Sequence, residues 1–123
     1  MDARRVIHLN QEVHPANAAR TTLGHSIGRW EGDTLVVDTA RYLPGVIYQY
    51  VVDADAKLTG LLHSDAYRVL ERIRFNPSTR QLEIEYTQSD RKYHTAALPT
   101  GSLRFRTAAV PLEKWNCRPD GSG

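Results

Sequence analysis

The feature that most constrains the fold is a two-residue alternation over residues 67–75. Its odd-numbered positions are aromatic or aliphatic around a single acid, Glu71, and three of its four even-numbered positions are arginine. A period of two is typical of a β-strand with one buried face, because successive side chains point to opposite sides. This stretch is therefore predicted to be a strand that buries its odd-numbered side.

The residues that follow predict the partner strand. Residues 76–79, Asn-Pro-Ser-Thr, favour a turn, and residues 81–87 resume the alternation with Tyr86 on the apolar side. Pairing the two strands places the arginines of the first opposite Glu83 and Glu85 of the second. A solvated outer face of this kind accounts for its own charges without an acidic or nucleic-acid partner.

A second hairpin is predicted over residues 25–40, HSIGRWEGDTLVVDTA, because Gly32 can supply the positive φ of a tight turn. Either placement of the turn around this glycine gives the same two faces. One face carries Gly28, Trp30, Leu35 and Val37, and the other carries His25, Ile27, Arg29, Val36 and Asp38. The first face is expected to be the core side.

Weaker signals complete a mainly β architecture. They predict strands over residues 4–9, 46–52, 91–97 and 103–110, a short helical turn within 53–65, a loop over 10–23 and a flexible tail over 118–123. We expect a single domain spanning residues 1–123, an antiparallel meander that forms a small barrel or a strongly curved sheet, lipocalin-like in general shape. Such folds carry a pocket inside or at the open end.

Composition argues against several classes of function. The 16 Lys and Arg residues exceed the 14 Asp and Glu residues by a net charge of +2, too little to predict nucleic-acid binding. Cys117 is the only cysteine, which excludes an intrachain disulfide and a cysteine zinc site. No apolar run approaches the ~18 residues of a membrane span, and residues 1–8 lack the apolar core of a signal peptide. We expect a cytoplasmic chain that binds neither nucleic acid nor membrane.

Residues 24–39, GHSIGRWEGDTLVVDT, resemble the shared block of a large group of uncharacterised bacterial proteins, G-[HD]-S-x-G-x-W-E-G-D-T-L-V-V-[ED]-T. The resemblance continues at residues 63–75, HSDAYRVLERIRF, and more weakly at Trp115-Asn116-Cys117. It implies a β domain of bacterial origin. Many members are exported, which leaves the compartment open, and the family brings no activity to this chain.

Three residues are candidates for proton-transfer chemistry. The alternation points Glu71 toward the apolar side, where a carboxylate must be paired, neutral or exposed to a cavity. A β-bulge or a salt bridge to an arginine is the alternative interpretation. His25 and Asp38 share a face, and a carboxylate beside an imidazole can orient a general base. The alternative for this pair is a cross-strand ion pair in solvent.

Four more residues are candidates for a ligand-binding wall: Trp30, Tyr67, Tyr86 and His63. Aromatic side chains suit a pocket, although in strands they mostly serve packing. Gly24-His25-Ser26-Ile27-Gly28 matches the G-x-S-x-G pattern of hydrolases, but the strand-to-helix context of that motif is missing. His25, His63 and Glu71 lack the spacing of a metal site, and we predict neither a metal nor a cofactor.

Three functions remain open at this point. The preferred one is a domain that binds an apolar or amphipathic small molecule. The second is an enzyme that uses Glu71 or the His25–Asp38 pair for proton transfer, of the isomerase, lyase or hydrolase type. The third is a structural or interaction module that forms a homodimer through sheet edges or an exposed face.

Overall fold

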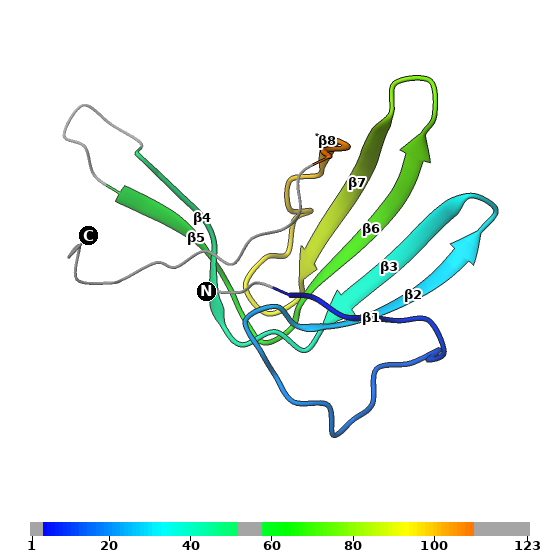
Figure 1. Cartoon of the computed structure of the whole chain (residues 1–123). Coiled ribbons are helices and arrows are strands. Elements are labelled where there is room, and N and C mark those ends of the chain that lie inside the picture. Colours follow the sequence, from blue (N-terminus) through cyan, green and yellow to red (C-terminus); the bar gives the residue numbers. More distant parts are fainter. Residues whose placement is uncertain (1–3, 52–57, 110–123) are drawn as a thin grey trace, which may run out of the picture.

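The computed structural model describes residues 4–51 and 58–109, which form eight β-strands and no helix (Figure 1). The strands are β1 (Ile7–His8), β2 (His25–Glu31), β3 (Thr34–Ala40), β4 (Gly45–Val51), β5 (Leu58–His63), β6 (Tyr67–Asn76), β7 (Gln81–Asp90) and β8 (Gly101–Arg106). The mainly β fold predicted from the sequence is confirmed. The described part of the chain contains no helix that could cross a membrane.

Six strands form one sheet in the order β1-β2-β3-β6-β7-β8. Its pairs are antiparallel except β1 with β2, which is parallel. β4 and β5 form a separate hairpin between β3 and β6 in the chain, and Figure 1 shows this hairpin leaving the sheet at an angle. In the described residues β1 and β8 are the edges of the sheet, which does not close into a barrel.

The two predicted hairpins are confirmed. In the first, Gly32 has a φ of 62° in the turn, and Gly28 pairs with Val37 and Trp30 with Leu35, as the face assignment requires. In the second, Glu71 pairs with Tyr86 and Arg72 with Glu85. The Asn76 side-chain oxygen accepts hydrogen bonds from the amides of residues 78 and 79 at 3.0 and 3.3 Å, which closes the turn.

Several weaker predictions are wrong. Residues 58–63 form strand β5 rather than a helical turn, because the apolar residues there pair with β4. Residues 91–97 form turns and bends rather than a strand, since the Asp90 side chain accepts hydrogen bonds from the amides of Lys92 and Tyr93 and turns the chain. The strands predicted over 4–9 and 103–110 are shorter than expected. The loop over 10–23 is confirmed, whereas residues 52–57 and the tail 118–123 lie outside the described residues.

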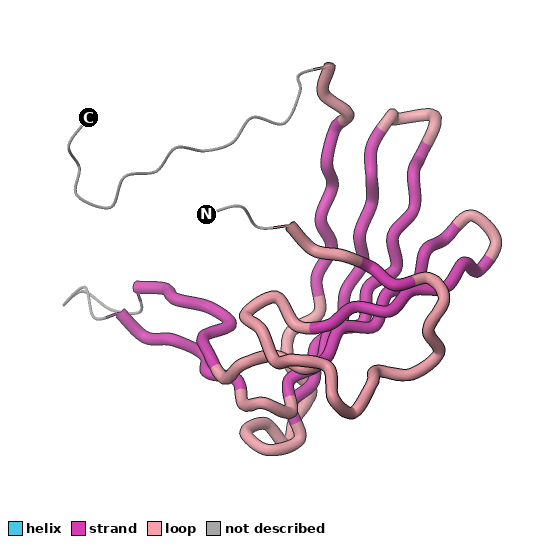
Figure 2. The backbone as a smooth tube through the Cα atoms, turned by 60° about the horizontal axis from the view of Figure 1, so that its bottom comes forward, coloured by secondary structure: helices cyan, strands magenta, loops and turns pink. Residues whose placement is uncertain are grey.

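The core lies at one end of the sheet, where the long loop between β1 and β2 folds back beside the first strands (Figure 2). Val37 is fully buried on the predicted core side, but Val36 on the opposite side is also only 2% exposed. The expectation of one core face is therefore wrong here: both faces of β3 are covered. Trp30, assigned to the core side, is 61% exposed because it lies near the other end of β2.

Candidate functional site

The register divides the predicted site residues between the two faces of the sheet. Glu71 and Tyr86 are cross-strand partners, and the row that they form continues through Val37 to Gly28. Trp30 follows Gly28 by two residues on the same strand, so it lies on the same face. His25 and Asp38 lie on the opposite face. The sequence thus placed these residues correctly, and the roles proposed for them remain predictions.

Glu71 is held by an arginine that precedes the sheet in the chain. Arg5 donates hydrogen bonds to both carboxylate oxygens of Glu71, at 2.6 and 3.3 Å, and the Glu71 side chain is 12% exposed. This two-point ion pair is the alternative that the sequence left open for a carboxylate on an apolar face. A carboxylate neutralised in this way is poorly suited to act as a free base.

His25 and Asp38 are linked through His14, a residue that sequence reasoning missed. The Nδ1 atoms of His14 and His25 are 2.9 Å apart, and His14 Nε2 lies 3.5 Å from Asp38 Oδ2. His8 stacks on the His25 ring with centroids 4.8 Å apart. His14 lies in the loop between β1 and β2, where no periodicity fixes the direction of a side chain, so no pattern could have placed it here.

Asp38 is held more tightly by Arg68 than by the histidines. Arg68 donates to both carboxylate oxygens of Asp38, through Nε at 2.6 Å and through Nη2. Burial alone would raise the pKa of Asp38, but the hydrogen bonds and charge of Arg68 outweigh it and lower that pKa. Asp38 is therefore an anion already matched by a cation, as Glu71 is.

We expect the cluster of His8, His14 and His25 to make the fold less stable in mild acid. Burial and the neighbouring His14, His8 and Arg41 lower the pKa of His25 from its ordinary 6.5. The folded chain then binds fewer protons at His25 than the unfolded chain, so this contribution to stability is present above pH 6.5 and is lost as the pH falls below it. In urea unfolding at pH 7.5 and 5.5, His25→Gln should show a smaller acid loss than the wild type.

The matched control for that measurement is His94→Gln, because His94 lies outside the cluster and hydrogen-bonds the Leu62 carbonyl oxygen. It should retain the acid loss of the wild type. An equal acid loss in His25→Gln and the wild type would contradict the assignment.

His63 and Tyr67 belong to an aromatic group with Tyr42. The His63 and Tyr67 rings stack with centroids 4.4 Å apart, and Tyr42 packs against both. Tyr67 also donates a hydrogen bond to Gln88, whose side-chain amide donates to the Pro99 carbonyl oxygen at 2.7 Å. Two of the four residues suggested for a ligand-binding wall thus lie in contact with each other, and both are buried; their role in binding stays a prediction.

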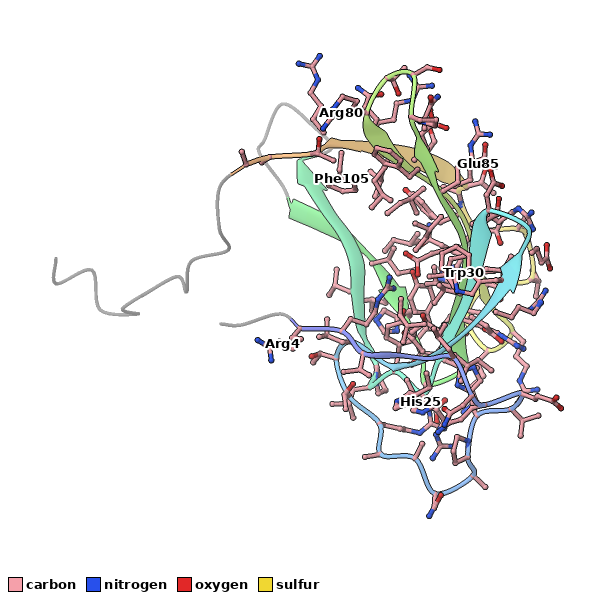
Figure 3. All side chains as sticks on the ribbon, turned by 45° about the vertical axis from the view of Figure 1, so that its right-hand side comes forward. Arg4, His25, Trp30, Arg80, Glu85 and Phe105 are labelled. Carbon is pink, nitrogen blue, oxygen red and sulfur yellow. The ribbon has the colours of Figure 1, made fainter. Side chains whose placement is uncertain are left out.

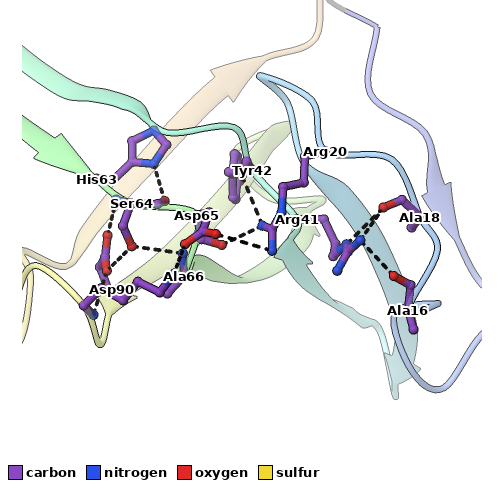
Figure 4. Close-up of polar contacts among 11 residues, drawn as sticks. Ala16, Ala18, Arg20, Arg41, Tyr42, His63, Ser64, Asp65, Ala66 and Asp90 are labelled. Carbon is purple, nitrogen blue, oxygen red and sulfur yellow. Dashed lines mark hydrogen bonds and ion pairs between the residues drawn. The ribbon is translucent and has the colours of Figure 1, made fainter.

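Beside this group, Ser64 and Asp90 form a buried polar network (Figure 4). Asp90 accepts from the Ser64 amide at 2.5 Å and from the Ser64 hydroxyl at 2.7 Å. Burial would raise the pKa of Asp90, but these bonds and the amides of Lys92 and Tyr93 lower it to about 2. His63 hydrogen-bonds the Ser64 carbonyl oxygen rather than the Ser64 hydroxyl. His63, Ser64 and Asp90 therefore stabilise the fold and do not form a catalytic triad.

A cleft of about 740 Å³ opens next to this network. Its wall includes Tyr67, Gln88 and Asp90, four alanines, and the arginines Arg20, Arg41, Arg68 and Arg91. A second hollow of about 660 Å³ lies under the loop between β1 and β2; its wall includes Asp38, and it shares Arg68 with the first cleft. Three of the predicted site residues, Glu71, Trp30 and Tyr86, line neither of these two hollows.

Arg41 is the most unusual residue of the cleft. Its backbone has a φ of 64°, a left-handed conformation that costs a non-glycine residue roughly 1–2 kcal/mol. Its guanidinium donates three hydrogen bonds, all to the carbonyl oxygens of Ala16 and Ala18, which leaves Nη1 without a partner among the described residues (Figure 4). No sequence pattern predicts this conformation of an arginine.

The G-x-S-x-G pattern of the sequence finds no support. Ser26 of the G-x-S-x-G match is 1% exposed and hydrogen-bonded to the Thr39 hydroxyl at 2.8 Å, so it cannot serve as an accessible nucleophile. Within residues 4–51 and 58–109, no group of three or more histidine, cysteine or acidic side chains could hold a metal ion.

Comparisons of the chain with protein-family models, with curated proteins and with solved structures find no match. The resemblance to the bacterial group stays a prediction.

Proposed function

We propose that the chain is a small-molecule-binding β domain whose ligand is an amphipathic anion held in the arginine-lined cleft. The observation that carries the proposal is a cleft of about 740 Å³ whose wall holds two arginines, Arg41 and Arg91, without an acidic partner among the described residues. Small-molecule sites typically enclose about 300–1,000 Å³ and combine an apolar lining with a few fixed polar groups.

The charges around the cleft support an anionic ligand. Asp90 is saturated by hydrogen bonds, and Asp65 pairs with Lys92 at 2.5 Å and with Arg20 at 3.8 Å, so neither acid neutralises Arg41 or Arg91. Among the described residues Arg41 and Arg91 have no carboxylate within ion-pair distance. A guanidinium offers two parallel donors that match a carboxylate or a phosphate.

The left-handed backbone of Arg41 is further support. Glycine would adopt this conformation without strain, so an arginine here costs stability that its side chain must offset. Its bonds to Ala16 and Ala18 hold the guanidinium in place and leave Nη1 available. Fixing a cationic group before binding reduces the entropy that a ligand must overcome.

The rest of the lining favours an apolar body on the same ligand. Ala40, Ala66, Ala96 and Ala97 line the cleft together with the Tyr67 ring. Small side chains leave room for a compact hydrocarbon or aromatic group, and burial of that group adds about 25 cal/mol per Å². Proton-transfer catalysis has less support, because arginines already hold the carboxylates of both Glu71 and Asp38.

Isothermal titration calorimetry with phenyl phosphate, inorganic phosphate, hexanoate and 1-hexanol tests the proposal. Phenyl phosphate or hexanoate should bind, inorganic phosphate more weakly and 1-hexanol least, because only the first two carry both an anion and an apolar body. Added salt should weaken the binding. Absence of binding by both phenyl phosphate and hexanoate would contradict the proposal.

Arg91→Gln removes one cation from the cleft, and among the described residues the Arg91 side chain makes no hydrogen bond or ion pair that would be lost. We expect about a tenfold loss of affinity for the better probe, the effect of one charge-assisted hydrogen bond. Arg106→Gln is the matched control, since Arg106 is an exposed arginine on β8 and does not line the cleft. Equal affinity losses in the two variants would show that binding depends on net charge alone.

A further inference from the structure

The end of the sheet that holds the β2–β3 and β6–β7 turns carries an exposed apolar surface, which is separate from the cleft. We call it the outer apolar face and define it by Trp30, Phe75, Leu82, Leu103 and Phe105, which are 37–61% exposed. The register places Phe75, Leu82 and Phe105 in one row and Leu103 with Trp30 in the next, separated by the half-buried Ile73 and Ile84. The surface therefore runs without interruption from β2 to β8.

The outer apolar face and the charged face are opposite sides of one layer. Figure 3 shows Trp30 and Phe105 on one side of the sheet and Glu85 on the other. On the charged face Arg72 pairs with Glu31 and Arg74 pairs with Glu83. That face therefore needs no covering layer and can stay exposed to solvent. A sheet with one apolar face normally buries it against a second layer, and large exposed apolar patches mark interaction sites.

The charge of the outer apolar face favours a second copy of the same chain as that layer. None of its five side chains is charged, and the nearest acid on this side, Glu71, is neutralised by Arg5. Two such faces meet without bringing like charges together, and the same patch serves both partners in a two-fold contact. A nucleic acid or another charged partner would find no complementary group there.

The size of the surface is sufficient for a stable pair. Aromatic side chains carry about 150–250 Å² each, so the three half-exposed aromatics present roughly 300 Å² per copy, and the two leucines raise this to roughly 450 Å². Two copies would bury roughly 900 Å² of apolar surface. Because homodimer interfaces are about 65% apolar, this corresponds to roughly 1,400 Å² in total, within the range of stable interfaces.

We propose that the chain forms a homodimer in which the outer apolar faces of two copies pack against each other, as the two layers of a β-sandwich do. Sheets packed in this way lie about 10 Å apart with interdigitating side chains. Trp30, Phe75 and Phe105 become the buried centre of the interface. The cleft lies elsewhere, so failure of this proposal leaves the ligand proposal standing, and the reverse also holds.

Analytical ultracentrifugation of the full chain over a range of concentrations tests the dimer. The wild type should show a reversible monomer–dimer equilibrium, and Phe75→Glu should weaken it at least a hundredfold by placing a charge in the centre of the contact. Leu70→Glu is the matched control: Leu70 is on the same strand and is 42% exposed against 47% for Phe75, but it lies on the opposite face. It should dimerise as the wild type does.

Circular dichroism of both variants separates a lost interface from a lost fold, and Trp30→Lys provides a second disruption if Phe75→Glu fails to fold. A wild type that stays monomeric at the highest attainable concentration overturns the proposal. Equal dimerisation of the wild type and folded Phe75→Glu also overturns it. If deletion of residues 110–123 turns a monomeric wild type into a dimer, the chain's own C-terminal segment is the occupant instead.

Discussion

Replacing Asp90 with alanine is expected to lower the free energy of unfolding by about 3–4 kcal/mol. The carboxylate is 2% exposed and accepts four hydrogen bonds, from the amide and hydroxyl of Ser64 and from the amides of Lys92 and Tyr93. A buried donor that loses its partner costs roughly 1–3 kcal/mol, and here several are lost together. Urea unfolding monitored by circular dichroism measures the change.

Acid titration of the same transition provides a second readout. Because the pKa of Asp90 is about 2 in the fold against 3.8 ordinarily, its contribution to stability is present above pH 3.8 and is lost between about pH 4 and pH 2. Asp90→Ala should show no such contribution. Asp65→Ala is the control, since Asp65 is a partly exposed neighbour, and it should leave the stability nearly unchanged. A similar loss in both variants would refute the role assigned to Asp90.

Gly24→Ala is expected to cost about 3 kcal/mol of folding free energy. Gly24 has a φ of 69°, which strains any residue with a Cβ, and an added Cβ would lie 2.6 Å from the carbonyl oxygen of Ala40. That oxygen belongs to the β3 backbone, so it cannot rotate away as a side chain could. The strand pair β2–β3 would have to shift to admit the methyl group.

Gly32→Ala separates the two parts of this cost. Gly32 has nearly the same backbone, with a φ of 62°, but an added Cβ there meets nothing within 4 Å. We expect about 1 kcal/mol, the cost of the left-handed conformation alone. Thermal and urea unfolding of the pair measure the difference. Equal destabilisation by the two substitutions would show that the Ala40 carbonyl imposes no constraint.

The sheet was predictable where local chemistry and periodicity agree. The alternation around Glu71, the Asn76 turn and Gly32 each specify one local geometry, and the observed register follows from them. The helical turn was wrongly predicted at residues 58–63 because the three leucines there suit a helix, yet pairing with β4 decides the conformation. The strand predicted over residues 91–97 was wrong because one buried side chain, Asp90, turns the backbone there. The alternation of residue types carries no information on such a contact.

The candidate site was less predictable than the sheet. Faces follow from strand parity, so His25 and Asp38 could be placed on one side and Glu71 on the other. The groups that complete each site come from loops and edges: His14 beside His25, Arg5 beside Glu71 and Arg41 at the cleft. No repeat relates such residues to their partners, because they lie outside the strands, where tertiary packing and not alternation sets the direction of a side chain.

The hairpin β4–β5 is an excursion between two strands that are hydrogen-bonded to each other, β3 and β6. The register of the main sheet is therefore set without it. Lengthening such an excursion adds only the slow logarithmic cost of a longer closed segment, about 0.6 kcal/mol per doubling. Insertions and deletions between β3 and β6 can accumulate over evolution while the cleft keeps its geometry, which makes this hairpin the natural place for related chains to diverge.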